Sequence, residues 1–408
     1  MADSVAWDVS GRKVSVTHPD KVIFPDAGVT KRDLIDYYLA VADGALRGVA
    51  DRPMILKRFV KGITEEAIFQ KRAPEKRPEW IEVAELKYAS GTSAKEAVLS
   101  DAAGLVWAVN LGCVDLNPHP VRAADLDHPD ELRVDLDPMP GVEWEQILAV
   151  AQVAREVLAD HGLTAWPKTS GSRGFHIYAR IHPQWPFKQV RLAAETVARV
   201  VEQRAPDLAT ARWWKEERGA RVFVDFNQNA KDRTVASAYS VRATPDARVS
   251  TPLRWDEVPQ CRAEAFTIAT VPARFADMGD PWEGMDNSAG GLEPLLELAE
   301  ELGPMEKRGK APKDGRRQST MPLIEVARTK TRDEALAALD VWRDRHPGAA
   351  RRLTPVDVLI DGMRGPSSIW YRVRINLQHV PEDERPAQEA LIADYSPWIG
   401  YTGGQFRR

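Results

Sequence analysis

Leu132-Arg-Val-Asp-Leu-Asp-Pro138 alternates apolar and polar residues with a period of two, which predicts a β-strand with one buried face. Successive residues of a strand point to opposite faces, so Asp135 and Asp137 must point the same way. Two carboxylates on one strand face can hold a divalent metal ion. Taken alone, the Asp-x-Asp pattern is weak evidence, because it also occurs in solvated loops that have no role.

Two later segments also read as strands that carry polar groups on an apolar frame. Phe175 to Ile181 alternates cleanly and places His176 on its polar face. The run from Arg221 to Asn229 contains a third carboxylate, Asp225. A site built from carboxylates offers only oxygen ligands, which favours Mg²⁺ or Mn²⁺ over zinc. Two such ions suit nucleotidyl transfer, whereas an ion pair with Arg221 is the alternative role for Asp225.

A glycine-rich turn separates two of the predicted strands. In Ser170-Gly-Ser172-Arg173-Gly174 the glycines let successive amides point inward as an anion-binding nest, and Arg173 adds charge for a triphosphate. His176 would face the same site, although a single strand histidine is more often structural. Further candidates to hold the triphosphate and sugar are Gln228 and Arg242.

Two groups of basic residues predict contacts with a polyanion. Lys31 follows Thr30 at the start of a predicted capped helix, where a cation opposes the helix dipole unless an anion binds there. Together with Lys21 it can grip a phosphate. The stretch from Lys57 to Trp80 mixes basic side chains with aromatic ones such as Phe69, which suits base stacking and phosphate neutralisation. Solvated lysines and ordinary core aromatics are the alternatives.

The composition is that of an ordinary globular protein. The chain has 408 residues, a formal net charge of -4, 43% hydrophobic and 28% charged residues. This charge argues against indiscriminate coating of nucleic acid but leaves room for a local basic groove. No apolar stretch approaches the length of a membrane span and the acidic start has no signal-peptide pattern, so we expect a cytoplasmic protein without a membrane partner. Cys113 and Cys261 are expected to be buried thiols.

Composition also divides the chain into three parts. Residues 1–290 alternate helical and strand patterns and contain every catalytic candidate. Residues 291–320 shift to Gly, Pro and basic residues, as in a flexible basic linker. Residues 321–408 predict a small α/β accessory module, with a helix capped by Thr331 and a strand from Ser368 to Ile375. Charge alone suggests that this module contacts DNA or a partner such as an end-binding repair protein.

Three motifs in this order resemble the archaeo-eukaryotic primase superfamily, and above all the polymerase domain of bacterial ligase D, the enzyme of non-homologous end joining. The motifs are Asp135-Leu-Asp137, Ser170 to His176 and Asp225. Three further segments also resemble the sequence of that domain: His18 to Pro25, Val222 to Asn229 and Ala238 to Arg242. The resemblance covers residues 8 to 285 and implies a two-lobed α/β (α+β) catalytic domain whose metal-bearing sheet is like an RNA-recognition motif. The module after residue 321 lies outside it.

This resemblance implies a DNA-dependent polymerase that prefers ribonucleotides, uses Mn²⁺ or Mg²⁺, fills short gaps with a 5'-phosphate in gapped or broken duplexes, and adds untemplated nucleotides. It implies two divalent ions held by Asp135, Asp137 and Asp225. The positions that match contacts with the NTP or dNTP are Ser170, Ser172, Arg173, His176, Gln228, Arg242 and Asn117. Those that match DNA contacts are Lys21, Lys31, Lys57, Phe69 and Arg218, with the first two at the 5'-phosphate.

Some residues depart from the family pattern, and two other functions stay open. Arg173 replaces a usual Lys, Asn117 a usual His, and Ile68 a Phe that stacks on template. No ligase or nuclease module follows, so we expect a stand-alone, nucleoid-associated member that works with a separate ligase. A primase that starts chains without a primer would use the same site. A repair scaffold that binds broken ends through Lys21 and Lys31, with a vestigial active site, is the alternative outside the enzymes.

Overall fold

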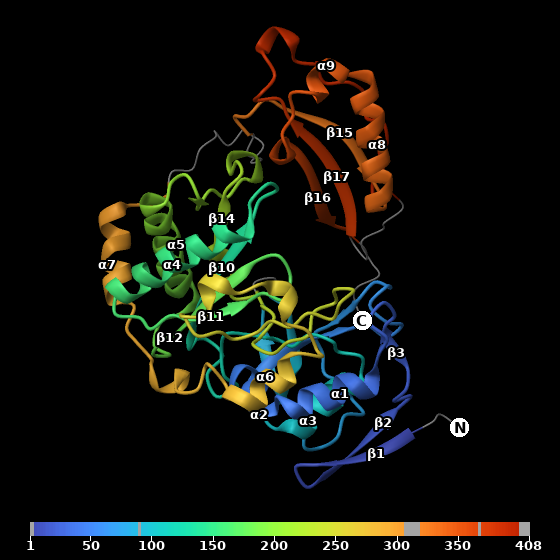
Figure 1. The fold of residues 1–408 in the computed structure, drawn as a ribbon, viewed down its shortest axis with the longest axis vertical. Helices are drawn as coiled ribbons and strands as arrows, with labels where there is room; N and C mark the ends of the chain where they lie inside the picture. Colours follow the sequence, from blue (N-terminus) through green and yellow to red (C-terminus); the bar gives the residue numbers. More distant parts are fainter. Residues whose placement is uncertain (1–3, 89–90, 306–318, 366–368, 400–408) are drawn as a thin grey trace. The chain divides into compact units, whose positions relative to one another are not determined.

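A computed structural model describes residues 4–88, 91–305, 319–365 and 369–399, which fall into two compact units (Figure 1). The first unit consists of Met1–Pro138, Glu143–Ala211 and Val222–Pro304; the second consists of Met139–Val142, Arg212–Arg221 and Met305–Arg408. The second unit therefore takes two short segments from within the range predicted as the catalytic domain. The segment Arg212–Arg221 forms hydrogen bonds and ion pairs with the C-terminal module, and the amide of Met139 donates to the carbonyl of Arg221.

The sheet that carries the candidate metal ligands lies in the first unit. Its strand order is β11-β12-β10-β14-β13, antiparallel except for the short edge strand β13. Along the chain its elements are β10 (Glu131–Pro138), α4 (Trp144–Asp160), β11 (Trp166–Thr169), β12 (Phe175–Arg180), α5 (Phe187–Arg204), β13 (Ala209–Thr210) and β14 (Val222–Asp225). Without the short edge strand β13, this βαββαβ succession is the predicted RNA-recognition-motif arrangement.

The central strand β10 has an apolar and a polar face, as its alternation predicted. Leu132, Val134 and Leu136 are buried on the face covered by α4 and α5. The intervening residues Glu131, Arg133, Asp135 and Asp137 point to the other face. Because side chains alternate along every strand, the neighbouring strands present their polar residues on this face too.

The N-terminal part of the first unit contains a second sheet with the order β6-β5-β8-β7 and with β9 beside β5. Its elements are β1 (Ser4–Val9), β2 (Arg12–Thr17), β3 (Val22–Phe24), β4 (Val29–Thr30), α1 (Lys31–Ala40), α2 (Ala42–Val49), β5 (Arg52–Arg58), β6 (Ile68–Gln70), β7 (Glu82–Lys87), β8 (Ser93–Leu99), α3 (Ala102–Asn110) and β9 (Asn117–Pro118). The predicted capping box at Thr30 is confirmed, since its hydroxyl accepts from the Asp33 amide.

Buried tyrosines of α1 join this part to the segment that carries Arg242. The Tyr37 hydroxyl donates to the carbonyl of Tyr239 at 2.8 Å, and the Tyr38 hydroxyl accepts from the amide of Val241 at 3.0 Å. Both rings lie in the large core cluster of the first unit. The position of Arg242 is thus tied to the interior of the fold.

The first unit ends with α6 (Val271–Met278) and α7 (Glu293–Leu302). Helix α7 lies inside the range predicted as a basic linker, so that prediction is corrected for residues 293–302. The helix packs on α5, where Arg199 donates to the carbonyls of Leu302 and Gly303. Its acidic and apolar sequence forms a helix because Leu295 and Ala299 are buried. Residues 306–318 of the predicted linker lie outside the described residues.

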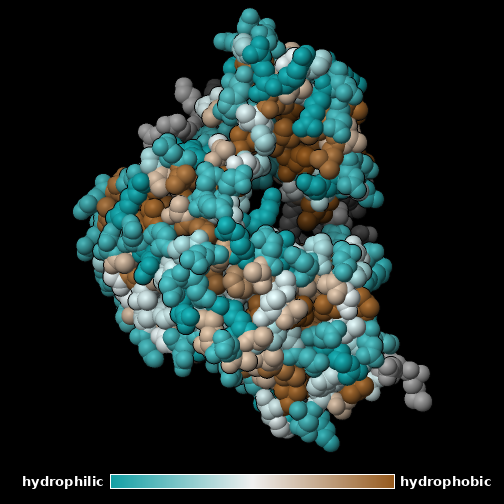
Figure 2. Space-filling model, viewed as in Figure 1, coloured by the Kyte–Doolittle hydropathy of each residue, from teal (hydrophilic) through white to brown (hydrophobic). Residues whose placement is uncertain are grey.

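The second unit contains a three-stranded antiparallel sheet of order β15-β17-β16. Its elements are β15 (Leu323–Thr329), α8 (Arg332–Arg345), α9 (Pro347–Ala350), β16 (Val358–Arg364) and β17 (Ile369–Asn376). The Thr331 capping box is confirmed. Hydrophobic side chains are visible over these strands in Figure 2, and Leu336, Val341 and Ile369 are among the exposed apolar residues of this unit.

The segment Arg212–Arg221 belongs to this second unit through specific polar contacts. Lys215 pairs with Asp361 at 3.2 Å, and the side chain of Asn376 donates to the carbonyl of Glu216. Glu216 also lies 3.5 Å from Arg374. This segment leads directly into β14, which ends in Asp225.

Cys113 and Cys261 are buried free thiols, as predicted. Among the described residues, none of the helices combines the length and the apolar character that crossing a bilayer would require.

Candidate active site

The three candidate carboxylates meet on the polar face of the central sheet. Asp135 lies opposite Asp225 of β14, and Asp137 follows two residues further along the same strand face. One ligand oxygen from each of Asp135, Asp137 and Asp225 lies within 4.8 Å of the others. The structure therefore brings together the ligand set that the sequence indicated.

The surroundings of these carboxylates fit a divalent cation. Oδ1 of Asp135 is buried and accepts no hydrogen bond within the described parts of the chain. Asp225 is held in place, since it accepts from the Asn227 amide at 2.8 Å and from Gln228 at 2.9 Å. Burial raises the pKa of Asp135 to about 6, although Lys168 and Arg242 oppose this. A cation bound among the three oxygens would remove this cost of burying charge.

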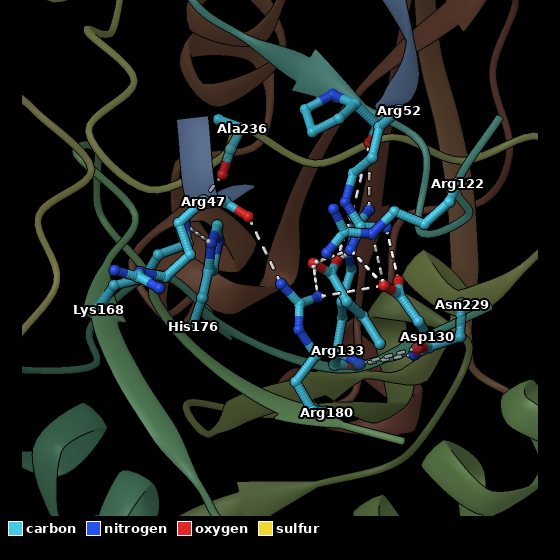
Figure 3. A network of polar contacts seen from close by, with 12 residues as sticks. Arg47, Arg52, Arg122, Asp130, Arg133, Lys168, His176, Arg180, Asn229 and Ala236 are labelled. Atoms are coloured by element: carbon cyan, nitrogen blue, oxygen red, sulfur yellow. Dashed lines mark hydrogen bonds and ion pairs between the residues drawn. The ribbon is translucent and has the colours of Figure 1, made fainter. Parts of the chain in front are cut away.

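His176 joins the site from the other neighbouring strand. It lies opposite Asp135, with its Nε2 3.2 Å from Asp135 Oδ1. Its Nδ1 contacts the buried Lys168 of β11 at 2.7 Å (Figure 3). Burial lowers the pKa of His176 well below its usual value, and Lys168 and Arg242 lower it further. The ring is therefore neutral in this environment.

The glycine-rich turn is closed by its own serine. Oγ of Ser170 accepts from the amides of Ser172 and Gly174 at 3.1 and 3.0 Å. Two amides that an anion nest would need are thus already used inside the turn, which corrects that part of the prediction. Arg173 is exposed, so its charge stands at the surface of the turn.

Gly171→Ala is expected to lower the free energy of unfolding by about 2 to 3 kcal/mol. Gly171 has φ of +67°, and a Cβ there would lie 2.6 Å from Cγ of Arg242 and 2.8 Å from the Ser250 amide. Gly162→Ala is the matched control, because Gly162 has φ of +77° with nothing within 4 Å. It should cost only about 1 kcal/mol in urea unfolding. Equal losses in both variants would show that steric contact at Gly171 is unimportant.

Arg242 and Lys57 share a buried carboxylate that sequence reasoning missed. Asp115 pairs with Lys57 at 2.9 Å and lies 3.8 Å from Arg242, whose Nη1 donates to the carbonyl of Ser170. The only sequence signal for Asp115 as a site residue was its position two residues before the candidate Asn117. The amide of Asn117 contacts the carbonyl of Asp115 at 3.4 Å, so these residues form one connected group.

With this geometry in view, comparison with known proteins identifies the family. The family model for the LigD primase-polymerase domain matches residues 30–282, more than half of the chain. The chain belongs to this family. LigD primase-polymerase domains are nucleotidyl-transferring polymerases of DNA repair, and the acidic triad, His176 and the glycine-rich turn all lie within the matched residues.

Several LigD proteins illustrate the relationship. The multifunctional non-homologous end joining protein LigD of Mycolicibacterium smegmatis is 32% identical over 279 residues, which are 68% of this chain and 36% of that protein. LigD of Mycobacterium bovis is 29% identical over 412 residues, covering 97% of this chain and 51% of its own length. This chain thus spans between about a third and a half of these relatives. The second match also extends past residue 321, into the module that was expected to lie outside the resemblance.

A solved structure supports the fold assignment. The polymerase domain of Mycobacterium tuberculosis ligase D, solved in complex with DNA, is 32% identical with a TM-score of 0.64. The alignment covers 68% of this chain and 99% of that domain. The predicted archaeo-eukaryotic primase-like fold is confirmed.

In this LigD-type domain the lysines expected at a 5'-phosphate lie near each other. Lys31 is buried, and its Nζ donates to the carbonyls of Thr17 and Asn110 at 2.6 and 3.2 Å. Lys21 donates to the carbonyl of Val60. Burial, and then the charge of Lys21, lowers the pKa of Lys31. The alternative of Lys31 in open solvent is wrong, because its ammonium group is buried and donates to acceptors of the protein itself.

The other residues expected at DNA fall into different environments. Nζ of Lys57 lies over two rings, 5.1 Å from the centroid of Phe59 and 5.9 Å from that of Phe69. Phe69 is 64% exposed on β6 and can stack on a base. Arg218 belongs to the second unit and donates to the carbonyls of Arg212 and Trp213.

A buried ion-pair network, not predicted from sequence, supports β10 beside the triad (Figure 3). Glu131 contacts Arg180 at 2.6 Å, Arg133 at 2.7 Å and Arg52 at 3.1 Å. All four side chains are at most 4% exposed. Burial alone would raise the pKa of Glu131, but the three guanidinium groups hold it far below its usual value. The network fixes the start of the strand that carries the candidate metal ligands Asp135 and Asp137.

Proposed function

We propose that this chain is a DNA-dependent nucleotidyltransferase that extends a primer 3'-end with NTPs or dNTPs and prefers ribonucleotides. It fills short gaps that carry a 5'-phosphate and adds untemplated nucleotides. The observation that most supports this proposal is that carboxylate oxygens of Asp135, Asp137 and Asp225 lie within 4.8 Å of one another in a member of the LigD primase-polymerase family. We place this activity in double-strand break or gap repair at the nucleoid, with an end-binding protein and a separate ligase as partners.

Residues of the site have distinct parts in this reaction. Two divalent ions, Mn²⁺ or Mg²⁺, would activate the 3'-hydroxyl and stabilise the leaving pyrophosphate. Asp135, Asp137 and Asp225 would hold them, while Gln228 keeps Asp225 oriented through its 2.9 Å hydrogen bond. His176 offers Nε2 to the same place.

Around the glycine-rich turn, positive charge suits the triphosphate of the incoming nucleotide. Arg242 is anchored to Ser170 by a 2.6 Å hydrogen bond, and Arg173 stands exposed on the same turn. Ser172 and Asn117 complete the group proposed to contact the nucleotide. The planar guanidinium group of Arg can donate two parallel hydrogen bonds to two oxygens of one phosphate group, which the ammonium group of Lys cannot do.

Primer extension tests the proposal directly. The substrate is a gapped duplex with a 5'-phosphate, supplied with Mn²⁺ and either NTP or dNTP, and the wild type is compared with Asp135→Ala/Asp137→Ala. We expect extension only by the wild type, with NTPs used more efficiently. If neither protein extends the primer while both bind the gap, the repair-scaffold alternative replaces the polymerase.

Lys21→Ala is expected to weaken binding to a 5'-phosphorylated gap about tenfold, because one charge-assisted contact to the phosphate is lost. Binding to the same gap with a 5'-hydroxyl should not change. Fluorescence anisotropy with both duplexes measures this difference, and Lys13→Ala, at an exposed position of β2, is the control. Equal weakening for both duplexes would remove Lys21 from the phosphate site.

A further inference from the structure

Asp115 is a buried carboxylate with no part in the proposed reaction so far, yet two basic side chains of the site converge on it. Its Oδ2 lies 2.9 Å from Nζ of Lys57 and 3.8 Å from Nε of Arg242. The side chain of Asp115 is 1% exposed, whereas those of Lys57 and Arg242 are 21% and 24% exposed. A bound phosphate can therefore reach the two cations, while the carboxylate acts on it only through them.

The main chain holds Asp115 in place independently of its side chain. The carbonyl of Val114 accepts from the Tyr38 hydroxyl at 2.6 Å, and the same hydroxyl accepts from the amide of Val241 at 3.0 Å. One buried tyrosine thus joins the residue before Asp115 to the residue before Arg242. The carboxylate and the base of the arginine side chain are therefore fixed relative to each other.

The guanidinium group of Arg242 is anchored at its tip, while its Nε depends on Asp115. Nη1 donates to the carbonyl of Ser170 at 2.6 Å, and Cγ lies so close to Gly171 that a Cβ there would come within 2.6 Å. Within the parts of the chain that the structure describes, Nε of Arg242 and Oδ1 of Asp115 are buried and have no hydrogen-bond partner. A buried donor without a partner is costly, so the negative charge of Asp115 is what favours this direction of Nε.

Sharing one carboxylate leaves the group with a positive charge to offer. Lys57 and Arg242 bring two positive charges to the single negative charge of Asp115, and the excess can be neutralised by a phosphate. A long side chain that is free loses rotamer freedom when it binds a ligand, whereas one already held by a buried partner loses less. The carboxylate therefore favours phosphate binding by orientation, although its charge opposes it.

We infer that Asp115 is a positioning residue of the active site, whose shared carboxylate holds the guanidinium group of Arg242 and the ammonium group of Lys57 ready for phosphate oxygens. For Arg242 the phosphate belongs to the triphosphate of the incoming nucleotide, and for Lys57 it belongs to DNA. The identity of these phosphates rests on the proposed function. The orientation of the two cations rests on the contacts alone.

The orientation of Arg242 can be measured in metal-free protein without nucleotide or DNA. Protein labelled with ¹⁵N-arginine gives the NMR order parameter of each Nε–H bond, and the signal of Arg242 is assigned by its loss in Arg242→Lys. We expect an order parameter of about 0.8 in the wild type and below about 0.6 in Asp115→Asn, which keeps the shape of the side chain and removes its charge. An unchanged order parameter in Asp115→Asn would overturn the inference.

Lys57→Met gives a second measurement that leaves the buried carboxylate in place. It removes the competing cation, so the contact of 3.8 Å between Asp115 and Nε of Arg242 can shorten to a hydrogen bond. We expect the Nε–H proton signal of Arg242 to move downfield. An unmoved signal would contradict the shared carboxylate, so the inference stays testable even if Asp115→Asn does not fold.

Asp280→Asn is the matched control. Asp280 is also a buried carboxylate, 6% exposed, and pairs with Arg47 at 2.6 Å. It accepts from the Tyr239 hydroxyl at 2.9 Å, three residues before Arg242, and its hydrogen bonds and ion pairs among the described residues do not include Arg242. We expect the wild-type order parameter at Arg242. A loss as large as that in Asp115→Asn would mean that general loosening, and not the missing carboxylate, frees the arginine.

A double-mutant cycle in primer extension tests the consequence for the nucleotide. Asp115→Asn should raise KM for the nucleotide about tenfold with a smaller change in kcat, because the guanidinium group is no longer held. In an Arg242→Gln background the same change should raise KM by less than about twofold, since no guanidinium group is left to position. Equal increases in both backgrounds would overturn the inference. So would a lower KM in Asp115→Asn, which is expected if the carboxylate only weakens the positive charge.

The inference and the proposed function fail in different ways. An Arg242 that is ordered in the wild type and mobile in Asp115→Asn, in a protein that does not extend primers, supports the positioning role and removes the polymerase. An active polymerase in which Asp115→Asn leaves the order parameter of Arg242 unchanged removes the positioning role and leaves the polymerase in place.

Discussion

Asp135→Asn is expected to reduce primer extension by about a thousandfold or more and, at the same time, to stabilise the metal-free protein. The loss of activity follows from the loss of one of three carboxylates within 4.8 Å, since a neutral amide cannot balance the charge of two divalent ions. The gain in stability follows from the burial of this carboxylate. A buried carboxylate proposed to bind metal would thus weaken the fold when the metal is absent.

The sign and size of this gain follow from the pKa of Asp135. Burial raises it to about 6, whereas Lys168 and Arg242 lower it, and in the unfolded chain the carboxyl ionises near 3.9. Between these values the folded protein binds the additional proton, so this residue's contribution to stability falls as pH rises from about 4 to about 6. At about 1.4 kcal/mol per pKa unit, Asp135→Asn should be more stable than wild type by about 2 to 3 kcal/mol above pH 7.

Urea unfolding in the presence of a chelator, at pH 4.5 and pH 7.5, measures this effect. The difference between Asp135→Asn and wild type should be small at the lower pH and full at the higher. Asp137→Asn is the control: Asp137 is exposed, so this variant should lose activity equally and gain little stability. A pH-independent difference would refute the burial argument, and substantial extension by Asp135→Asn would refute its role as a metal ligand.

Local patterns predicted the parts of the site that depend on strand geometry. The alternation of residues 132–138 placed Asp135 and Asp137 on one face because the period of a strand does not change with its surroundings. The capping boxes at Thr30 and Thr331 were predictable for the same reason, since they involve residues three positions apart. His176 and Asp225 could be named as candidates from their own strands, but only pairing places both opposite Asp135.

Features that depend on pairing between distant segments could not be predicted. Register between strands is set by packing of the whole sheet, so nothing in the sequence placed Lys168 opposite His176. Lys31 was expected at a helix start, yet its burial depends on Asn110, far along the chain. Helix α7 was not predicted, because its formation depends on the burial of Leu295 and Ala299 against distant segments. The contacts of Arg212–Arg221 with Asp361 and Arg374 are equally non-local.

Glu131→Gln is expected to lower the free energy of unfolding by about 3 to 5 kcal/mol, the largest stability effect of any single change at this site. Glu131 is the shared partner of Arg52, Arg133 and Arg180, which are 0%, 1% and 4% exposed. The amide keeps the shape of the side chain but removes the charge that all three guanidinium groups require. Three cations would then remain buried with only part of their neutralisation, from Asp130 and Asp286.

Urea unfolding at pH 7.5 gives this loss, with Asp286→Asn as the matched control. Asp286 also pairs with Arg180, at 2.7 Å, but is 45% exposed, so water replaces its charge and the expected loss is below about 1 kcal/mol. Similar losses in both variants would show that burial of Glu131 does not decide its contribution to stability.

Because Glu131 lies on the same strand face as Asp135, Glu131→Gln should also loosen the start of β10 and reduce primer extension by displacing the candidate metal ligands. That reduction should shrink under stabilising osmolytes, whereas the loss in Asp135→Asn should not.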